Sequence, residues 1–199
     1  MSTSSQPIAV ITGGARGIGR QLATDLLARG YRVVIGDLDQ AATDATAAEL
    51  GAGASAVRLD VTDRTNLAAV VAHVEATVGP IALWINNAGI MPTGPFRDQK
   101  MAVARAIIDI NYAGVVEGTA AVLPGMLERH AGTIVNLASA TGIKPLAGVA
   151  VYSGTKAAVI AFTQSLRREL RGTGVRLIVV SPNLVRPALG TGITPPRPI

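Results

Sequence analysis

The stretch Ile8-Ala9-Val10-Ile11-Thr12-Gly13-Gly14-Ala15-Arg16-Gly17-Ile18-Gly19 is an apolar run that leads directly into a glycine-rich loop. The apolar run predicts a buried strand, and the residues from Gly17 onward predict a helix. Glycines let the backbone turn tightly and approach a ligand, while the free amides at the positive end of the helix attract an anion. The junction therefore predicts a phosphate site, with a purely structural glycine turn as the alternative. The expected phosphate-binding residues are Gly13, Arg16, Gly17, Ile18 and Gly19.

The rest of the chain repeats this alternation of short Val- and Ile-rich runs with longer Ala-rich amphipathic stretches. Such a pattern is typical of an α/β fold in which helices cover both faces of a doubly wound parallel sheet. Gly30, Gly79 and Gly172 are the expected helix stops. Strands are predicted at 8–12, 32–36, 55–59, 81–86, 132–137 and 175–180, and helices at 17–29, 40–50, 64–78, 101–129 and 152–171.

The composition points to a single soluble domain over residues 1–199 with an irregular Pro-rich tail at 183–199. Hydrophobic residues make up 49% of the chain, which is ample for one core. No uninterrupted apolar run reaches the roughly 18 residues of a membrane span. Because there is no signal peptide and no cysteine, we expect a cytoplasmic protein without a membrane partner.

Charge and metal-ligand content exclude two further classes of function. The net charge is +5, but the arginines are scattered and lack interleaved aromatic residues, so no nucleic-acid partner is expected. The two histidines, His73 and His130, fall on predicted outer helices. We therefore expect neither a metal site nor a histidine-based catalytic triad.

Asp37 stands at the end of the second predicted strand. A dinucleotide-binding unit places a carboxylate there to accept hydrogen bonds from the adenosine ribose, and this carboxylate repels a 2′-phosphate. Asp37 therefore favours NAD(H) as the cofactor. The basic Arg16 in the glycine loop weakens the discrimination against a 2′-phosphate, so NADP(H) is the alternative cofactor. The alternative is a helix cap or turn residue, and Asp39 is the better candidate for the cap.

Two further segments contain asparagine residues that are candidates for the site. Asn86-Asn87-Ala88-Gly89 follows the fourth strand and lies beside the first strand if the strand order reverses there. Its small residues leave room for a flat ligand, although an ordinary Asx turn fits the same sequence. Asn111 lies inside a predicted long helix, where a poor helix former often marks a bulge or a bound water.

The strongest candidate for proton transfer is formed by Ser139, Tyr152 and Lys156. Tyr152 and Lys156 are four residues apart in a predicted helix, so they share one face, and Ser139 follows the fifth strand. A phenol needs a nearby positive charge to act near neutral pH, and Lys156 supplies one. Hydroxyl and phenol together are suited to polarising a carbonyl and moving a proton. A core tyrosine with a snorkelling lysine is the alternative.

In order and spacing, the glycine loop, Asp37, the pair Asp60-Val61, Asn86 to Gly89, Asn111, Ser139, Tyr152 and Lys156 resemble the short-chain dehydrogenase/reductase family. The resemblance spans residues 7 to about 182. It implies a Rossmann-like fold and transfer of a hydride between a nicotinamide and a secondary alcohol or ketone. It also implies a homodimer or homotetramer that pairs through the helices holding Asn111 and Tyr152.

The resemblance also implies a role for each matching residue. Tyr152 is the expected acid/base. Lys156 is expected to lower the pKa of Tyr152 and to hold the nicotinamide ribose. Ser139 is expected to orient the substrate oxygen, and Asn111 to support a water that relays protons. Asp60 and Val61 resemble the pair that contacts adenine, while Asn87, Ala88, Gly89, Pro182 and Val185 resemble residues that line the cofactor.

The segment after the sixth strand departs from the family pattern. Pro182-Asn183 replaces the usual Pro-Gly, and Pro187 stands where the family has a threonine that contacts the carboxamide. The usual covering segment and seventh strand are not expected here, which would leave the sixth strand as an exposed edge. A catalytically silent dinucleotide-binding or oligomer-forming protein is therefore the alternative function. An epimerase or dehydratase fits less well, because those relatives have a differently spaced loop and a longer substrate domain.

The substrate pocket is the least defined part of the sequence. Apolar residues at Ile90, Met91, Ile143 and Leu146 favour a hydrophobic alcohol or ketone.

Overall fold

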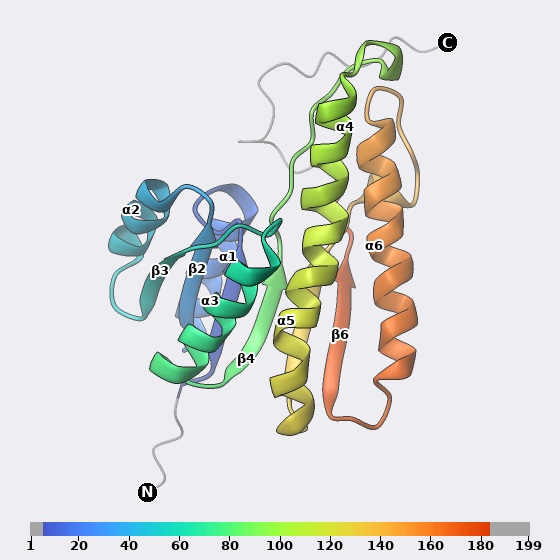
Figure 1. The fold of residues 1–199 in the computed structure, drawn as a ribbon. Helices are drawn as coiled ribbons and strands as arrows, with labels where there is room; N and C mark the ends of the chain where they lie inside the picture. The colour runs from blue at the N-terminus through green and yellow to red at the C-terminus, as the bar shows by residue number, and fades with distance from the viewer. Residues whose placement is uncertain (1–5, 184–199) are drawn as a thin grey trace, which may run out of the picture.

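A computed structural model describes residues 6–183 and shows a parallel sheet of six strands between two layers of helices (Figure 1). The strand order is β3-β2-β1-β4-β5-β6, and all neighbouring strands run parallel. This order confirms the predicted doubly wound α/β fold, with the reversal between β1 and β4. The strands are β1 (Ile8–Thr12), β2 (Arg32–Asp37), β3 (Ala54–Arg58), β4 (Ile81–Asn86), β5 (Gly132–Leu137) and β6 (Val175–Val180).

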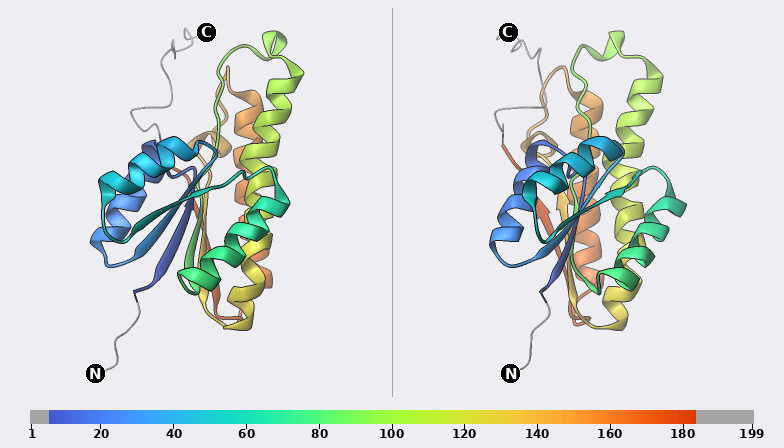
Figure 2. Two further views of the ribbon diagram at one scale, coloured as in Figure 1. Left: turned by 60° about the vertical axis from the view of Figure 1, so that its left-hand side comes forward. Right: turned by 90° about the vertical axis from the view of Figure 1, so that its left-hand side faces the viewer.

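Each face of the sheet has its own set of helices (Figure 2). On one face lie α1 (Gly17–Ala28) and α2 (Gln40–Leu50). On the other lie α3 (Arg64–Thr77), α5 (Gly114–Glu128) and α6 (Ala150–Glu169). The shorter elements are α4 (Met101–Ile108) and the single turns η1 (Phe96–Asp98), η2 (Asp109–Ala113) and η3 (Ala140–Gly142).

The alternation of side chains along β1 explains why both faces are apolar. Val10 points to the α3, α5 and α6 layer, and Ile11 points to the α1 and α2 layer. All five residues of β1 are buried, as expected for a central parallel strand. Along β6 the covering is thinner: Ile178 and Val180 remain 42% and 40% exposed at this edge of the described sheet.

A chain of buried polar side chains joins the sheet to the α5 and α6 layer. Trp84 Nε1 donates a hydrogen bond to Asn86 Oδ1 (2.7 Å), and Asn86 Nδ2 donates to Asn136 Oδ1 (2.8 Å). Asn86 Nδ2 also donates to Thr119 Oγ1 in α5, and Asn136 Nδ2 donates to Thr163 Oγ1 in α6. Because each of these polar groups is paired, burying them costs little, and the pairing fixes how the helices sit on β4 and β5.

The helix predicted over residues 101–129 is not one regular helix. It divides into α4, a π-helical turn at η2 and α5. Asn111 lies in the π turn and is fully buried, which confirms the expectation of a bulge at this residue. From this wider turn the Asn111 side chain reaches the main chain of Ile90, just after β4.

The stretch Met101–Glu128 is the one described helical segment that meets the length and hydropathy criteria for a membrane span. Core helices of soluble proteins meet the same criteria. Here the stretch packs against α3, β4 and α6, and Asn111 is buried within it. We therefore interpret it as part of the core.

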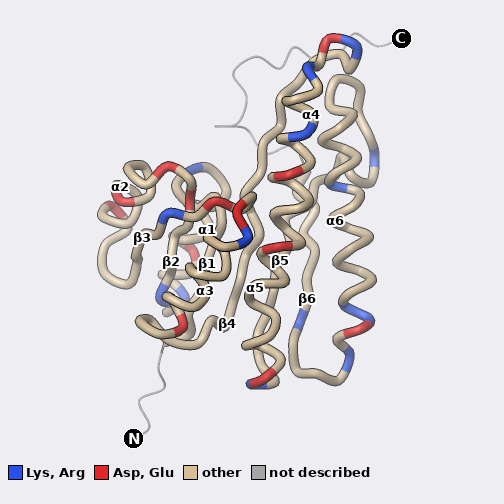
Figure 3. Tube along the Cα trace, viewed as in Figure 1, with Lys and Arg blue, Asp and Glu red and all other residues tan. Residues whose placement is uncertain are grey.

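Charged residues of both signs are spread along the whole described chain (Figure 3). The best-buried ion pair joins α3 to the end of α5: Arg129 Nη1 lies 2.9 Å from Glu75 Oε1, and Arg129 Nη2 donates to the Ile81 carbonyl. Arg64 and Glu117 form a looser, more exposed pair between the same helices (3.6 Å). Exposed pairs of this kind contribute little to stability.

Replacement of Asn86 by alanine should lower the free energy of unfolding by about 2–4 kcal/mol, because several buried partners lose a hydrogen bond at once. Urea unfolding of the purified protein measures the change. Thr77→Ala is the matched control, since Thr77 is exposed and bonds only to the His73 carbonyl in its own helix. Equal stability of Asn86→Ala and Thr77→Ala would contradict the structural role of the network.

Candidate active site

The glycine-rich loop between β1 and α1 comes close to the end of β4. Gly13 has a φ of +64°, and a Cβ there would lie 2.8 Å from the Ala88 Cα. A Cβ at Gly19 would lie 2.7 Å from Asn87 Nδ2. Neither position tolerates a side chain, so these glycines allow close backbone approach. Within the described residues, the N-cap residue Arg16 makes no capping hydrogen bond with its side chain, which leaves the first amides of α1 available to an anion.

Thr12 and Asn87 hold the loop in this position. Thr12 Oγ1 accepts hydrogen bonds from the amides of Asn87 and Ala88, both at 3.0 Å. Asn87 Nδ2 donates to the carbonyls of Thr12 and Gly13, both at 2.9 Å. The Asn87 side chain thus has a clear structural task in tying β4 to the loop. Thr12 was not among the predicted site residues, because nothing in its local sequence reveals a partner 75 residues away.

Two carboxylates lie beyond the loop, at the ends of β2 and β3. Asp37 is half-buried and accepts a hydrogen bond from the Ala15 amide at Oδ2 (3.3 Å). Asp39 is the N-cap of α2, as the sequence predicts, and accepts a hydrogen bond from the Ala42 amide.

Asp60, after β3, accepts hydrogen bonds from the hydroxyl and amide of Thr62, and these bonds lower the pKa of Asp60. The neighbouring Val61 is buried.

Ser139 and Tyr152 meet at the carboxyl end of β5. Ser139 hydrogen-bonds to Tyr152, and Ser139 Oγ also accepts a bond from Thr141 Oγ1 (3.0 Å). Burial raises the pKa of Tyr152, and the bond with Ser139 opposes this shift without cancelling it. Thr141 was missed by sequence reasoning, since a threonine two residues after a strand end carries no distinct signal.

Lys156 is buried beside this pair, with only 4% of its surface exposed. Its Nζ donates a hydrogen bond to the Leu137 carbonyl (2.7 Å) and lies 5.6 Å from the centroid of the Tyr152 ring. Burial disfavours the charged amine and lowers the pKa of Lys156 to about 8. The shift in the Tyr152 pKa comes from burial and from Ser139, so the predicted lowering of that pKa by Lys156 stays a prediction.

Asn111 reaches the same place from the π turn. Its Oδ1 accepts from the Ile90 amide and its Nδ2 donates to the Ile90 carbonyl, both at 2.8 Å. A Cβ at Gly89 would lie 3.2 Å from Asn111 Oδ1 and 3.7 Å from Lys156 Nζ. The structure therefore gathers Asn111, Lys156 and the Gly89 backbone around one point, beside Tyr152.

The two loops next to Tyr152 also meet. The Gly94 amide donates to the Gly148 carbonyl (2.9 Å), which ties the loop after β4 to the loop before α6. Ile143 and Leu146 in the second loop are 65% and 53% exposed. Of the residues after β6, the Pro182 carbonyl accepts from the Ala140 amide (2.9 Å). Val185, Pro187 and the rest of the predicted tail beyond Asn183 lie outside the described residues.

The sequence matches a family profile described as short chain dehydrogenase over residues 7–197. It is 35% identical to the 2-(S)-hydroxypropyl-CoM dehydrogenase 3 of Xanthobacter autotrophicus, a match that covers 89% of this chain and 71% of that protein. It is 37% identical to the ketoacyl reductase HetN of Nostoc, covering 93% and 66%. A 3-alpha-(or 20-beta)-hydroxysteroid dehydrogenase of Mycobacterium tuberculosis is 35% identical, covering 90% and 69%.

Solved structures agree with these sequence matches. A serine dehydrogenase from Escherichia coli superposes with a TM-score of 0.85 at 34% identity, covering 89% of this chain and 82% of that one. A short-chain dehydrogenase from Streptomyces avermitilis gives a TM-score of 0.86 at 32% identity, covering 93% and 68%. The chain thus spans about two thirds to four fifths of the length of these relatives, whose shares run from 66% to 82%.

The burial of Lys156 predicts a stability that rises with pH above about 8. In that range the folded amine loses its proton while the unfolded amine keeps it, so the unfolded state binds more protons and stability increases with pH. The slope contributed by this one group is at most about 1.4 kcal/mol per pH unit. Urea unfolding between about pH 7 and 9.5, below the range where tyrosine titrates, measures it.

Lys156→Met should remove the contribution of Lys156 to the rise of stability with pH. Lys144→Met, at an exposed position, should keep that rise. Parallel stability curves for the wild type and Lys156→Met would contradict the lowered pKa.

Proposed function

Because this chain belongs to the short-chain dehydrogenase family, we propose that it is an NAD(H)-dependent oxidoreductase acting on a secondary alcohol or ketone. The nicotinamide, when bound, supplies or accepts the hydride. The observation that carries the proposal is the meeting of Ser139, Tyr152 and Lys156 at the sheet edge next to the glycine loop. The groups proposed for proton transfer and the loop proposed to hold the dinucleotide thus lie at one edge of the sheet.

The residues of the loop fit a dinucleotide. The Cβ positions of Gly13 and Gly19 are filled by neighbouring backbone and side-chain atoms, so only glycine lets the loop pack this closely against the segment after β4. The compact loop that results is proposed to receive the diphosphate. The uncapped amides from Arg16 to Gly19 are suited to binding its oxygens. Asp60 and Val61 are proposed to contact the adenine, and Ala88, Gly89, Pro182 and Val185 to line the remainder of the site.

Tyr152 is the proposed acid/base. Its hydroxyl gives a proton to the substrate oxygen in the direction of reduction and takes one in the direction of oxidation. Ser139 lies beside Tyr152 and is proposed to turn its hydroxyl to the substrate oxygen, donating a second hydrogen bond that stabilises negative charge on it. Two donors on one oxygen polarise the carbonyl more than either alone.

Lys156 is proposed to adjust Tyr152 and to pass on its proton. An ammonium 5.6 Å from the ring favours the phenolate, and an amine with a pKa of about 8 exchanges protons readily near neutral pH. Asn111 fixes the Ile90 main chain next to Lys156 and is proposed to support a water that connects Lys156 to solvent. The half-buried Tyr152 then regains its protonation state after each turnover.

Asp37 supports NAD(H) as the preferred cofactor. Its carboxylate is held at the end of β2 by the Ala15 amide, where it is suited to accept hydrogen bonds from ribose hydroxyls and to repel a 2′-phosphate. The exposed side chain of Arg16, in the glycine loop, weakens the preference for NAD(H) over NADP(H) without reversing it. We therefore expect weaker, measurable binding of NADP(H).

The surroundings of the site favour an apolar substrate and a paired assembly. Ile143 and Leu146 are large, exposed and close to Tyr152 in the chain, as expected for a wall that contacts a hydrophobic alcohol or ketone. Met101 and Ile108 on α4 are 61% and 45% exposed, which supports pairing of subunits through the α4, α5 and α6 layer. We propose a cytoplasmic homodimer or homotetramer.

Tyr152→Phe should abolish turnover, with a loss of at least about a hundredfold, and leave NADH affinity within about twofold. The phenylalanine keeps the ring and removes the acid. NADH-dependent reduction of a ketone panel, together with a fluorescence titration of NADH, gives both quantities.

Tyr31→Phe, at the opposite end of the sheet, is the matched control and should keep full activity. Equal activity of the two variants would sink the proposal, and NADH binding without turnover by the wild type would favour the silent alternative.

Asp37→Ala should weaken NADH binding by about five- to twentyfold and narrow the gap between NADH and NADPH, because the ribose loses its acceptor and the 2′-phosphate loses its repulsion. The two dissociation constants are measured by fluorescence titration. Asp44→Ala removes the same charge from the exposed side of α2 and should leave both constants unchanged. An unchanged ratio in Asp37→Ala would show that cofactor choice is set elsewhere.

A further inference from the structure

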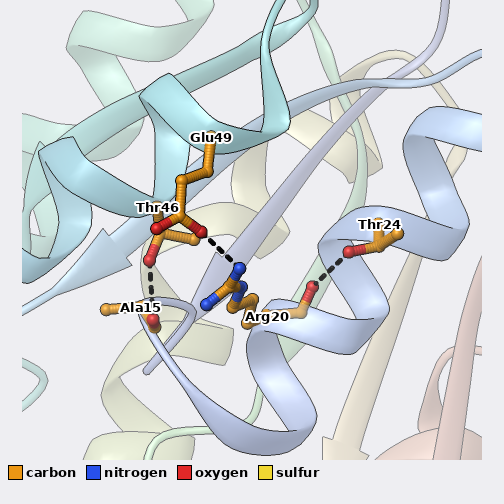
Figure 4. A network of polar contacts seen from close by, with 5 residues as sticks. All are labelled: Ala15, Arg20, Thr24, Thr46 and Glu49. Carbon is orange, nitrogen blue, oxygen red and sulfur yellow. Dashed lines mark hydrogen bonds and ion pairs between the residues drawn. The ribbon is translucent and has the colours of Figure 1, made fainter.

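Helix α2 is attached to the glycine-rich loop and to α1 by contacts that the functions assigned above do not use (Figure 4). Thr46 Oγ1 donates a hydrogen bond to the Ala15 carbonyl (2.8 Å). One turn further along α2, Glu49 forms an ion pair with Arg20 of α1. Thr46 and Glu49 are three residues apart and so share the helix face that meets the loop.

The Thr46 bond is the stronger of the two attachments. Thr46 is buried, with 5% of its surface exposed, so water does not compete for its hydroxyl. The Arg20 and Glu49 side chains are 47% and 57% exposed, and ion pairs at such sites contribute little. Most helical threonines bond within their own helix, as Thr43 does with the Asp39 carbonyl (2.6 Å). Thr46 instead reaches a residue 31 positions away.

The partner of Thr46 is a peptide that matters for cofactor binding. The peptide bond is planar and trans, so the Ala15 carbonyl and the Arg16 amide point in opposite directions. Holding the carbonyl toward α2 therefore turns the Arg16 amide away from α2. Arg16 is one of the residues whose amides are proposed to bind the diphosphate.

Ala15 is also held from its other side. Its own amide donates to Asp37 Oδ2 (3.3 Å), and Asp37 is the proposed acceptor for the ribose hydroxyls. Ala15 is buried and has no polar side chain of its own. The backbone of this single residue thus links Thr46 to both parts of the proposed adenosine diphosphate site.

We propose that Thr46 is a positioning residue of the dinucleotide site. By fixing the Ala15-Arg16 peptide, its hydroxyl holds the Arg16 amide in place for the diphosphate and, through the Ala15 amide, holds the Asp37 carboxylate in place for the ribose. The inference rests on the proposed function, because it concerns affinity for the same nicotinamide dinucleotide. Thr46 itself makes no contact with the reacting atoms.

Thr46→Val keeps the shape of the side chain and removes the donor. It should raise the NADH dissociation constant about three- to tenfold, the range expected for one lost buried hydrogen bond, and leave kcat at saturating cofactor unchanged. It should also reduce the preference for NADH over NADPH, because Asp37 is less well held. Thr46→Ser restores the hydroxyl and should return both quantities to within about twofold of the wild type.

Thr43→Val is the matched control, since it removes an equally buried hydroxyl from the same helix without touching the loop. It should lower thermal stability to a similar extent and leave both dissociation constants unchanged. If Thr46→Val does not fold, Thr46→Ala serves in its place. Wild-type affinity in the folded Thr46 variant, or an equal loss of affinity in Thr43→Val, would overturn the positioning role. Failure of the wild type to bind NADH would instead overturn the proposed function, and this inference with it.

Discussion

The hydrogen bond from Lys156 Nζ to the Leu137 carbonyl is the contact on which the arrangement of the site depends. It attaches α6 to the last residue of β5, in a place where water is excluded. Ser139 follows Leu137 by two residues and Tyr152 precedes Lys156 by one helical turn, so the same attachment brings the hydroxyl and the phenol together. Burial of the charged amine destabilises the folded state, as the lowered pKa of Lys156 shows. The same burial places the amine beside Tyr152.

The other half of the site depends on the reversal of strand order between β1 and β4. Because these strands are neighbours, the loop after β1 and the segment after β4 lie close enough for Thr12 and Asn87 to join them. The glycines then leave a surface over which a flat, negatively charged ligand can lie. The residues proposed to move the proton follow β5 or lie on α6, and β5 is the neighbour of β4 in the sheet. The topology therefore brings the two halves to one edge.

Much of this was predictable from the sequence. Central parallel strands are buried on both faces, so their Val- and Ile-rich runs marked the sheet, as at β4, predicted at 81–86 and found at Ile81–Asn86. The edge strand β3 was predicted at 55–59 and found one residue earlier, at Ala54–Arg58. The convergence of Ser139 and Tyr152 followed from a strand end and a helix spacing. Thr12 and Thr46 were missed because each bonds to the backbone of a residue far along the chain, and an isolated threonine does not reveal such a partner.

We propose that this site moves a hydride between a nicotinamide and a carbonyl carbon, with Tyr152 giving or taking the proton. The decisive measurement uses NADH in which both hydrogens at C4 of the nicotinamide are replaced by deuterium, a panel of apolar ketones and mass spectrometry of the alcohol formed. We expect the wild type to form an alcohol that has gained one deuterium on the carbinol carbon, and Tyr152→Phe to form no labelled alcohol. Binding of NADH by the wild type with no deuterium transferred to any ketone of the panel would contradict the proposal.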